Sequence, residues 1–193
     1  VSAFLTGTGE RCERLDAIPQ RLRNLAGFAL RNNTSAVIDA SNPNDIKLVG
    51  ADRTEQALLR FVTPYLSQNG AEMIDHIPFN STRKFSATQV TGEQALTLVK
   101  GAPEVILGHC THWLDGDGKA HDLSDSSPLQ AAMSELSTRA MRLLAVAVTE
   151  TPIDPETKTL PESLTLVGVF GMRDELRTTS YHSVKTAKDA GIH

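Results

Sequence analysis

The chain alternates between two patterns of apolar and polar residues, and the first is the spacing of amphipathic helices. Leu22, Ala26 and Leu30, for example, recur on one side of a stretch whose other positions carry arginines. A spacing of three or four residues predicts a helix with one buried face. Ser127 followed by Pro128 is a favourable helix start, with Ser127 as the N-cap. The expected helices cover residues 19–33, 54–65, 103–107, 127–140 and 178–190.

The second pattern is typical of strands, with short apolar runs bounded by turn residues. Thr91-Gly92-Glu93-Gln94 and Asp115-Gly116-Asp117-Gly118 are two such turns. The first 17 residues show little periodicity, so we expect a loop there. Short connections favour antiparallel pairing, which predicts an α+β fold with a mainly antiparallel sheet flanked by helices. The expected strands cover residues 73–79, 84–91, 95–99, 143–149 and 164–170.

The overall composition excludes several classes of protein. The 193 residues carry 19 Lys plus Arg against 23 Asp plus Glu, a formal net charge of −4. This balance argues against nucleic acid as a partner, because phosphate binding needs an excess of cations. We expect no transmembrane helix and no secretory signal, since no apolar run approaches the roughly 20 residues of a membrane span. The two cysteines predict reduced thiols in a cytosolic setting.

Familiar catalytic signatures are missing from the sequence. There is no phosphate loop of the Gly-x-x-x-x-Gly-Lys type, and Gly7-Thr8-Gly9 is too short for a dinucleotide fingerprint. His109, Cys110 and His112 form one cluster of possible metal ligands, but no second close pair completes a zinc site. The simpler interpretation is a core cysteine between two surface histidines, and we expect no metal site.

The segment from Phe79 to Lys84 is the most informative part of the chain. An aromatic residue ends one expected strand, and Arg83 and Lys84 begin the next. A flat ring beside two cations suits a purine nucleotide, because the base can stack while the cations meet phosphate. Sixteen residues later, Lys100 precedes Gly101, which would let a ligand approach the backbone. The alternative is that Phe79 is a core residue and the cations form an exposed turn.

Five segments, taken in order, resemble the nucleotide-binding domain of the cation-transporting P-type ATPases. The third is Lys-Gly-Ala-Pro-Glu, which reproduces the family's sequence in full. The others resemble its Gly-x-Pro-Thr-Glu-x-Ala-Leu-Leu, Phe-Asn-Ser-x-x-Lys, Leu-Arg-Val-Leu-Ala and Gly-x-x-Asp-Pro-Pro-Arg segments. The resemblance extends from about residue 20 to the C-terminus. The five segments are residues 50–59, 79–84, 100–104, 141–147 and 171–177.

This resemblance implies a pocket for ATP. Phe79 would stack on the adenine ring, and Glu55 would accept a hydrogen bond from its amino group. Lys84 and Lys100 would favour the anionic nucleotide, and Arg142 would reach the phosphate chain. The implied ATP-binding residues are Thr54, Glu55, Phe79, Lys84, Lys100, Gly101, Ala102, Arg142 and Leu144.

The sequence also departs from the family pattern. Ser81 stands where the family's animal calcium pumps often carry Arg, and Glu175-Leu176 replaces Pro-Pro between Asp174 and Arg177. The phosphorylated Asp of Asp-Lys-Thr-Gly-Thr does not occur in this chain. Phosphoryl transfer needs that nucleophile and a metal. The resemblance therefore assigns this chain no catalytic residue and no metal ligand, and leaves Mg²⁺ to the intact pump.

The resemblance further implies where such a chain belongs. Residues 1–164 would be the nucleotide-binding domain, and residues 165–193 a partial segment of the phosphorylation domain. The chain would be a cytoplasmic excerpt of an integral membrane protein, an ATP-driven cation translocase for which calcium is the favoured ion. Its partners would be an adenine nucleotide and the pump's phosphorylation and actuator domains. The alternatives are an interaction module that has lost the nucleotide and, less well supported, the cap domain of a soluble phosphatase.

Overall fold

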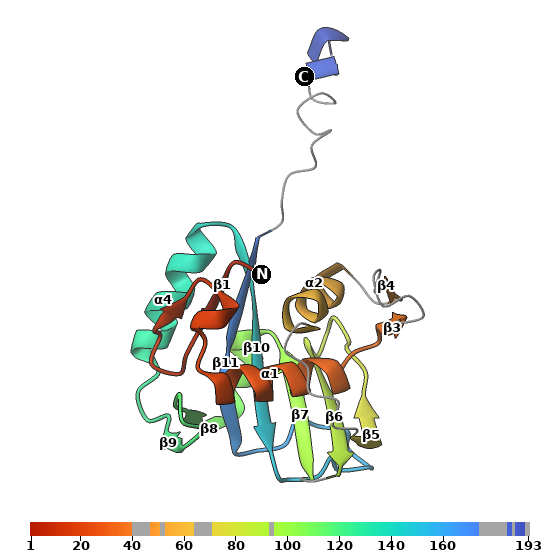
Figure 1. The fold of residues 1–193 in the computed structure, drawn as a ribbon, viewed down its shortest axis with the longest axis vertical. Helices are drawn as coiled ribbons and strands as arrows, with labels where there is room; N and C mark the ends of the chain where they lie inside the picture. The colour runs from red at the N-terminus through yellow and green to blue at the C-terminus, as the bar shows by residue number, and fades with distance from the viewer. Residues whose placement is uncertain are drawn as a thin grey trace.

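The computed structural model describes residues 1–39, 47–50, 53–63, 71–92, 95–173, 185–186 and 188–191. Their strands form a nine-stranded sheet and a separate two-stranded sheet, β3-β4 (Figure 1). The large sheet has the order β2-β1-β11-β10-β7-β6-β5, and β8 pairs with both β11 and β9. The strands are β1 (Ala3–Leu5), β2 (Arg11–Cys12), β3 (Val37–Asp39), β4 (Lys47–Val49), β5 (Glu72–Ile77), β6 (Phe85–Thr91), β7 (Leu96–Gly101), β8 (Cys110–Leu114), β9 (Ala120–Asp122), β10 (Met141–Thr149) and β11 (Leu164–Arg173).

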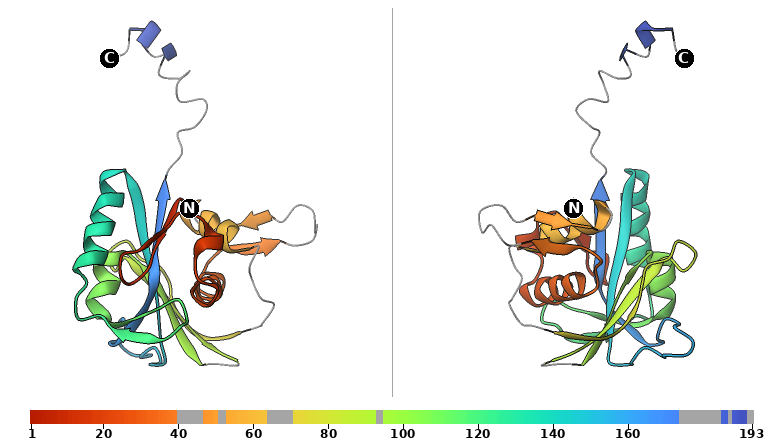
Figure 2. Two further views of the ribbon diagram at one scale, coloured as in Figure 1. Left: turned by 60° about the vertical axis from the view of Figure 1, so that its left-hand side comes forward. Right: turned by 90° about the vertical axis from the view of Figure 1, so that its right-hand side faces the viewer.

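The helices cover both faces of the large sheet. Figure 2 shows the first two helices on one face and the last on the opposite face. Short 3-10 turns, Leu15–Ala17 and Leu107–His109, add to the helices. The helices are α1 (Gln20–Asn32), α2 (Arg53–Val62), α3 (Pro103–Ile106) and α4 (Ser127–Thr138).

The described strand pairs are antiparallel, except that β8 runs parallel to β11. This arrangement confirms the predicted α+β class with a mainly antiparallel sheet. Four of the five expected helices and all five expected strands are present, with ends shifted by a few residues. Most of the fifth expected helix, residues 178–190, lies outside the described residues.

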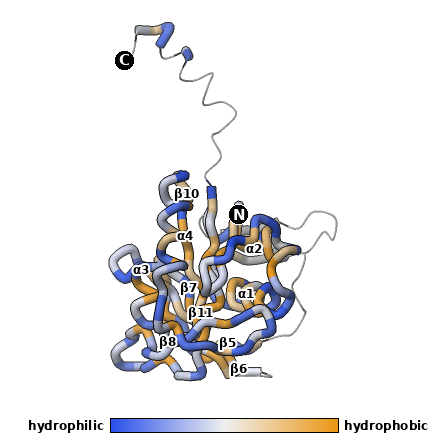
Figure 3. The backbone as a smooth tube through the Cα atoms, turned by 90° about the vertical axis from the view of Figure 1, so that its left-hand side faces the viewer, coloured by the Kyte–Doolittle hydropathy of each residue, from blue (hydrophilic) through white to orange (hydrophobic). Residues whose placement is uncertain are grey.

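Alternation along the central strands divides the apolar core in two. On β10, Val146 and Val148 belong to the cluster beneath α1 and α2, whereas Ala145 and Ala147 belong to the cluster beneath α3 and α4. Successive side chains of a strand point to opposite faces, so one apolar run can fill both layers. The apolar stretches of the backbone accordingly lie where helices and sheet meet (Figure 3).

Two local expectations are wrong. The first 17 residues are not a loop, because Phe4 and its neighbours form the buried strand β1, which pairs with β11 at Phe170. A three-residue strand is too short to show a period, and its burial depends on a partner far along the chain. At α4 the N-cap is Ser126, and the backbone N–H of Ser127 donates to Asp125 Oδ1 at 2.9 Å.

The expected domain boundary between residues 164 and 165 falls at the first residue of β11. That strand pairs with β10 from Thr165 to Arg173 and with β1 from Val169 to Gly171. Residues 165–173 therefore lie in the same sheet as the strands before them. The family's hinge position, at Asp174 to Arg177, lies outside the described residues. Within the described part of the chain, no helix combines the length and apolar character that crossing a membrane requires.

Candidate functional site

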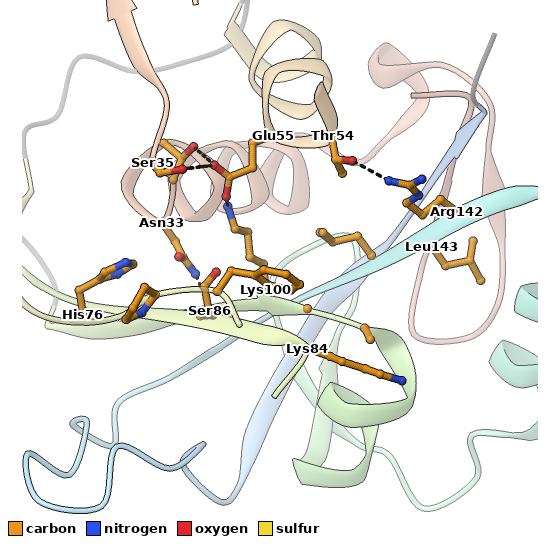
Figure 4. Close-up of a pocket in the computed structure, with 16 residues that line it drawn as sticks. Asn33, Ser35, Thr54, Glu55, His76, Lys84, Ser86, Lys100, Arg142 and Leu143 are labelled. Carbon is orange, nitrogen blue, oxygen red and sulfur yellow. Dashed lines mark hydrogen bonds and ion pairs between the residues drawn. The ribbon is translucent and has the colours of Figure 1, made fainter. Parts of the chain in front are cut away.

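One cavity of about 530 Å³ lies where the first turn of α2 and the end of α1 face strands β6, β7 and β10. Figure 4 shows the side chains of these elements converging on it. Every one of the nine residues predicted for ATP contributes to its lining, although they come from four separate segments of the sequence. The remaining lining residues are Asn33, Thr34, Ser35, His76, Pro78, Ser86 and Leu143.

Phe79 lies at the edge of this cavity with an unusually exposed ring. It is 59% exposed, so it is not the core residue of the alternative interpretation. The loop after it is tightly hydrogen-bonded, since Asn80 Oδ1 accepts the backbone N–H groups of Thr82 at 2.7 Å and Arg83 at 3.3 Å. Lys84 then adopts a left-handed φ of 59° before β6 begins. A well-defined turn thus presents an apolar face to the solvent.

Lys100 and Glu55 form an ion pair inside the cavity. Their side chains are only 6% and 15% exposed. Glu55 also accepts hydrogen bonds from the Thr34 hydroxyl at 3.0 Å and from the Ser35 N–H and hydroxyl at 3.1 and 2.9 Å. Burial raises the pKa of the Glu55 carboxyl, but the hydrogen bond and charge of Lys100 and the donors of Ser35 outweigh it and leave this pKa below its ordinary value. Glu55 is therefore ionised and balances the charge of Lys100.

Two other cations lie at the mouth of the cavity and are exposed. Lys84 Nζ lies 3.1 Å from Glu104, with side chains 53% and 63% exposed. Arg142 Nη1 donates to the Thr54 hydroxyl at 3.1 Å, which joins β10 to the first turn of α2. Exposed ion pairs are weak and easily exchanged. These two cations can therefore turn toward an anion at the cavity mouth.

The structure gives a second reason for a glycine at position 101, besides the expected approach of a ligand. A Cβ at this position would lie 2.5 Å from the Lys84 carbonyl oxygen and 2.7 Å from Phe85 Cβ. The backbone N–H of Ala102 donates to the same carbonyl at 2.9 Å. The glycine thus allows β7 to approach β6, and it also lines the cavity.

Five polar residues of the cavity were not predicted from the sequence: Asn33, Thr34, Ser35, His76 and Ser86. Asn33 donates its amide to the backbone carbonyls of Ser86 at 3.1 Å and Leu98 at 3.0 Å. His76 Nδ1 lies 2.9 Å from the Thr88 hydroxyl. Asn33 follows the last residue of α1, where an asparagine is an ordinary helix end. No signal in its neighbourhood points to a contact with Ser86, which lies 53 residues further along the chain.

The described residues do not suit a metal ion. Among them there is no group of three or more His, Cys, Asp or Glu side chains that could hold one. At the His109 cluster, both histidines pair with surface carboxylates, and burial raises the pKa of the Cys110 thiol to about 12. A thiol in that state is a poor metal ligand. In the cavity itself, Glu55 is already paired with Lys100, so this part of the chain does not fit Mg²⁺.

Comparison with known sequences connects this geometry to one family. The family model of the P-type ATPase cytoplasmic domain N matches residues 21–179. Calcium-transporting ATPase PAT1 of Dictyostelium discoideum is 28% identical over 184 residues, which cover 91% of this chain and 16% of the relative. Calcium-transporting ATPase 1 of Bacillus cereus is 32% identical over 163 residues, 80% of this chain and 18% of the relative. The plasma membrane-type calcium-transporting ATPase 1 of Oryza sativa subsp. japonica is 32% identical over 152 residues, which cover 72% of this chain and 14% of the relative. The chain spans less than a fifth of the length of these relatives.

Proposed function

Because this chain belongs to the P-type ATPase family, as its cytoplasmic domain N, we propose that it binds ATP in the cavity beside Phe79. The observation that carries the proposal is the exposed Phe79 ring at the edge of a cavity that three cationic side chains also line. An exposed aromatic ring is costly in water and offers a stacking surface to a base. Exposed Lys84 and Arg142 at the mouth supply charge for the phosphates.

On this proposal, the cavity contacts the base of ATP more completely than it contacts the phosphates. Lys100 is buried and its charge is balanced by Glu55, so it adds little net attraction for an anion. Lys84 and Arg142 are exposed and are screened by salt. The isolated domain therefore binds ATP weakly and leaves the γ-phosphate projecting from the cavity mouth. That arrangement suits a domain that delivers the γ-phosphate to an acceptor elsewhere.

The intact protein, on this proposal, is an ATP-driven calcium pump, as the names of its relatives suggest. The phosphate acceptor and the residues that hold Mg²⁺ lie outside this chain. On the same proposal, the nucleotide-binding domain includes β11, since this strand pairs with β10 up to Arg173. The segment that follows leads to the phosphorylation domain, which together with the actuator domain is this domain's partner within the pump.

A titration with ATP tests the proposed site. Phe79→Ala removes the stacking ring, and base stacking contributes about 1–3 kcal/mol. We therefore expect ATP to bind about 5- to 150-fold more weakly, measured by calorimetry or by NMR shifts. Met73→Ala is the matched control, because Met73 is 62% exposed and does not line the cavity. Equal affinities in the two variants would contradict the site.

The same titration separates ATP binding from the alternative function. A domain that kept the fold and lost the nucleotide would show no saturable change up to millimolar ATP. Lys100→Ala provides a second check, because it leaves Glu55 as an uncompensated negative charge in the cavity. We expect this variant to lose ATP binding through repulsion of the phosphates. Unchanged ATP affinity in Lys100→Ala would contradict the proposed site, because ATP would then bind away from this cavity.

A further inference from the structure

A second cavity lies beside the proposed ATP site and shares a wall with it. Its volume is about 820 Å³, and it lies between α3, the turn that follows α3, α4 and the start of β10. We call it the α3–α4 cavity. Ala102 and Leu143 line both this cavity and the proposed ATP site. A ligand in the α3–α4 cavity therefore lies across these two residues from the nucleotide.

The α3–α4 cavity offers a mixed apolar and polar surface. Leu107, Met133 and Leu143 are only half-buried, so part of each apolar side chain is accessible to a ligand. Gln130 and Ser134, both on α4, add exposed neutral polar groups. Methionine adapts to irregular apolar shapes and makes favourable contacts with aromatic rings. These walls suit the compact apolar body of a small molecule, with a few polar groups to orient it.

The charge of the α3–α4 cavity comes from one side chain. Among the lining residues that the structure describes, Glu104 alone is charged. Its own backbone N–H and the hydrogen bond from Lys84 hold the pKa of the Glu104 carboxyl below its ordinary value, so this carboxyl is ionised at neutral pH. A single carboxylate beside apolar walls attracts a ligand with one positive charge. Charge complementarity thus favours an apolar body that carries an ammonium group.

Glu104 also connects this cavity to the proposed ATP site. Its carboxylate accepts a hydrogen bond from Lys84 Nζ at 3.1 Å, and Lys84 lines the ATP site. Figure 4 shows the Lys84 side chain extending over α3. While this pair persists, Glu104 competes with a phosphate group for the lysine. A cation bound at Glu104 removes that competition and leaves the ammonium of Lys84 to the nucleotide.

We propose that the α3–α4 cavity is a second ligand site, which binds a primary amine with a compact apolar body and pairs its ammonium with Glu104. The amine takes the place of Lys84 at the carboxylate, and Lys84 turns to the phosphates of ATP. Each ligand then strengthens the binding of the other by the same factor. The amine site stands without a nucleotide, whereas its coupling to ATP rests on the proposed function.

Two probes of the same shape test the amine site. We use 2-phenylethylammonium, and 2-phenylethanol as a control with the same aromatic body and no charge. We expect the amine to give saturable NMR shifts at the backbone amides of Leu107 and Met133. The alcohol should bind about 1.5- to 5-fold more weakly, which is the range of an exposed ion pair. Equal affinities for amine and alcohol would overturn the role of Glu104.

Calorimetry tests the coupling between the two sites. With the α3–α4 cavity saturated by 2-phenylethylammonium, we expect ATP to bind about 1.5- to 5-fold more tightly. Glu104→Gln should raise the ATP affinity by a similar factor without the amine, because Lys84 is already released. In that variant the amine should lose its advantage over the alcohol and leave the ATP affinity unchanged. An amine that strengthens ATP binding equally in Glu104→Gln would overturn coupling through this residue.

Two further variants control for charge and for place. Glu156→Gln removes one exposed carboxylate that lines neither cavity, and we expect it to behave as the unmodified domain does. Gly108→Leu fills the α3–α4 cavity, because a Cβ at this position meets nothing within 4 Å. We expect Gly108→Leu to lose the amine shifts at Met133, with its folding checked by thermal unfolding. Amine shifts that persist in folded Gly108→Leu would place the amine elsewhere.

The outcomes separate this inference from the proposed function. Absence of saturable amine shifts, with ATP binding intact, overturns the amine site and leaves the ATP site. Saturable amine shifts without any ATP binding support the amine site and overturn the ATP site. Saturable binding of both ligands without mutual strengthening overturns the coupling and leaves both sites in place.

Discussion

Lys100 shows how the surroundings of one residue change its contribution to a site. Its sequence motif indicates a cation for the nucleotide, and it does line the cavity. Its charge, however, is met by Glu55 in a buried pair. In a buried ion pair each charge compensates the other, so removing either partner leaves the remaining charge uncompensated in a low-dielectric interior. Lys100 therefore keeps the cavity's shape and charge balance, while Lys84 and Arg142 supply the exposed positive charge.

Gly101→Ala tests the close approach of β7 to β6 beside this lysine. The added Cβ would meet the Lys84 carbonyl oxygen and the backbone of Phe85, neither of which can move without shifting β6. We expect a loss of about 1–3 kcal/mol in the free energy of unfolding, measured by urea denaturation. Gly108→Ala is the control, because its Cβ would meet nothing within 4 Å. Equal stability of the two variants would show that the strands separate easily at Gly101.

Among the elements, those with a clear period were predictable and those without one were not. α1 was predicted from its apolar spacing, and β10 from its run of aliphatic residues. β1 was missed, because a three-residue strand buried at every position shows no alternation. Its position depends on β11, which lies more than 160 residues further along the chain. Local pattern contains no information about such a partner.

The residues that line the cavity divide in the same way, into those that were predictable from the sequence and those that were not. Its predicted residues belong to motifs that resemble a known family, and all of them line it. Asn33 and Ser86 were missed because they meet only where the end of α1 packs on β6, and the two residues lie 53 positions apart in the sequence. Their place in the cavity thus depends on tertiary structure rather than on any motif.

Phe4→Ala tests whether β1 is an integral element of the fold. The Phe4 ring is 1% exposed and packs edge-on against Phe170, with ring centroids 5.1 Å apart. Removing a buried aromatic ring costs about 3–5 kcal/mol of unfolding free energy. Phe79→Ala removes the same ring from an exposed position, and we expect a change below about 0.5 kcal/mol. Similar urea midpoints for the two variants would mean that β1 contributes little to stability.

At the scale of the whole molecule, the fold separates support from binding. Two apolar layers, one on each face of the sheet, hold β6, β7 and β10 in place. The cavity lies where α1 and α2 face these strands, and Phe79 is placed by the loop between β5 and β6. A sheet supported on both faces gives the cavity a rigid floor. Binding then requires adjustment only of the exposed side chains at the mouth.

The chain as a whole is expected to bind ATP without hydrolysing it. The printed sequence has no Asp-Lys-Thr-Gly-Thr segment, and the described residues group no carboxylates that could hold Mg²⁺. Phosphoryl transfer needs both a nucleophile and a metal to stabilise the developing charge.

A ligand that binds only the folded state raises the unfolding temperature, so we expect millimolar ATP to raise the unfolding temperature of this domain measurably. Phosphate release should stay at the rate of ATP in buffer, and Mg²⁺ should change the ATP affinity by less than about 3-fold. Phe79→Ala controls for binding at other sites, because its unfolding temperature should respond less to ATP. Phosphate release that rises with protein concentration and is lost in Phe79→Ala would place a hydrolytic centre in this domain, and would contradict a division of labour in which the acceptor lies outside it.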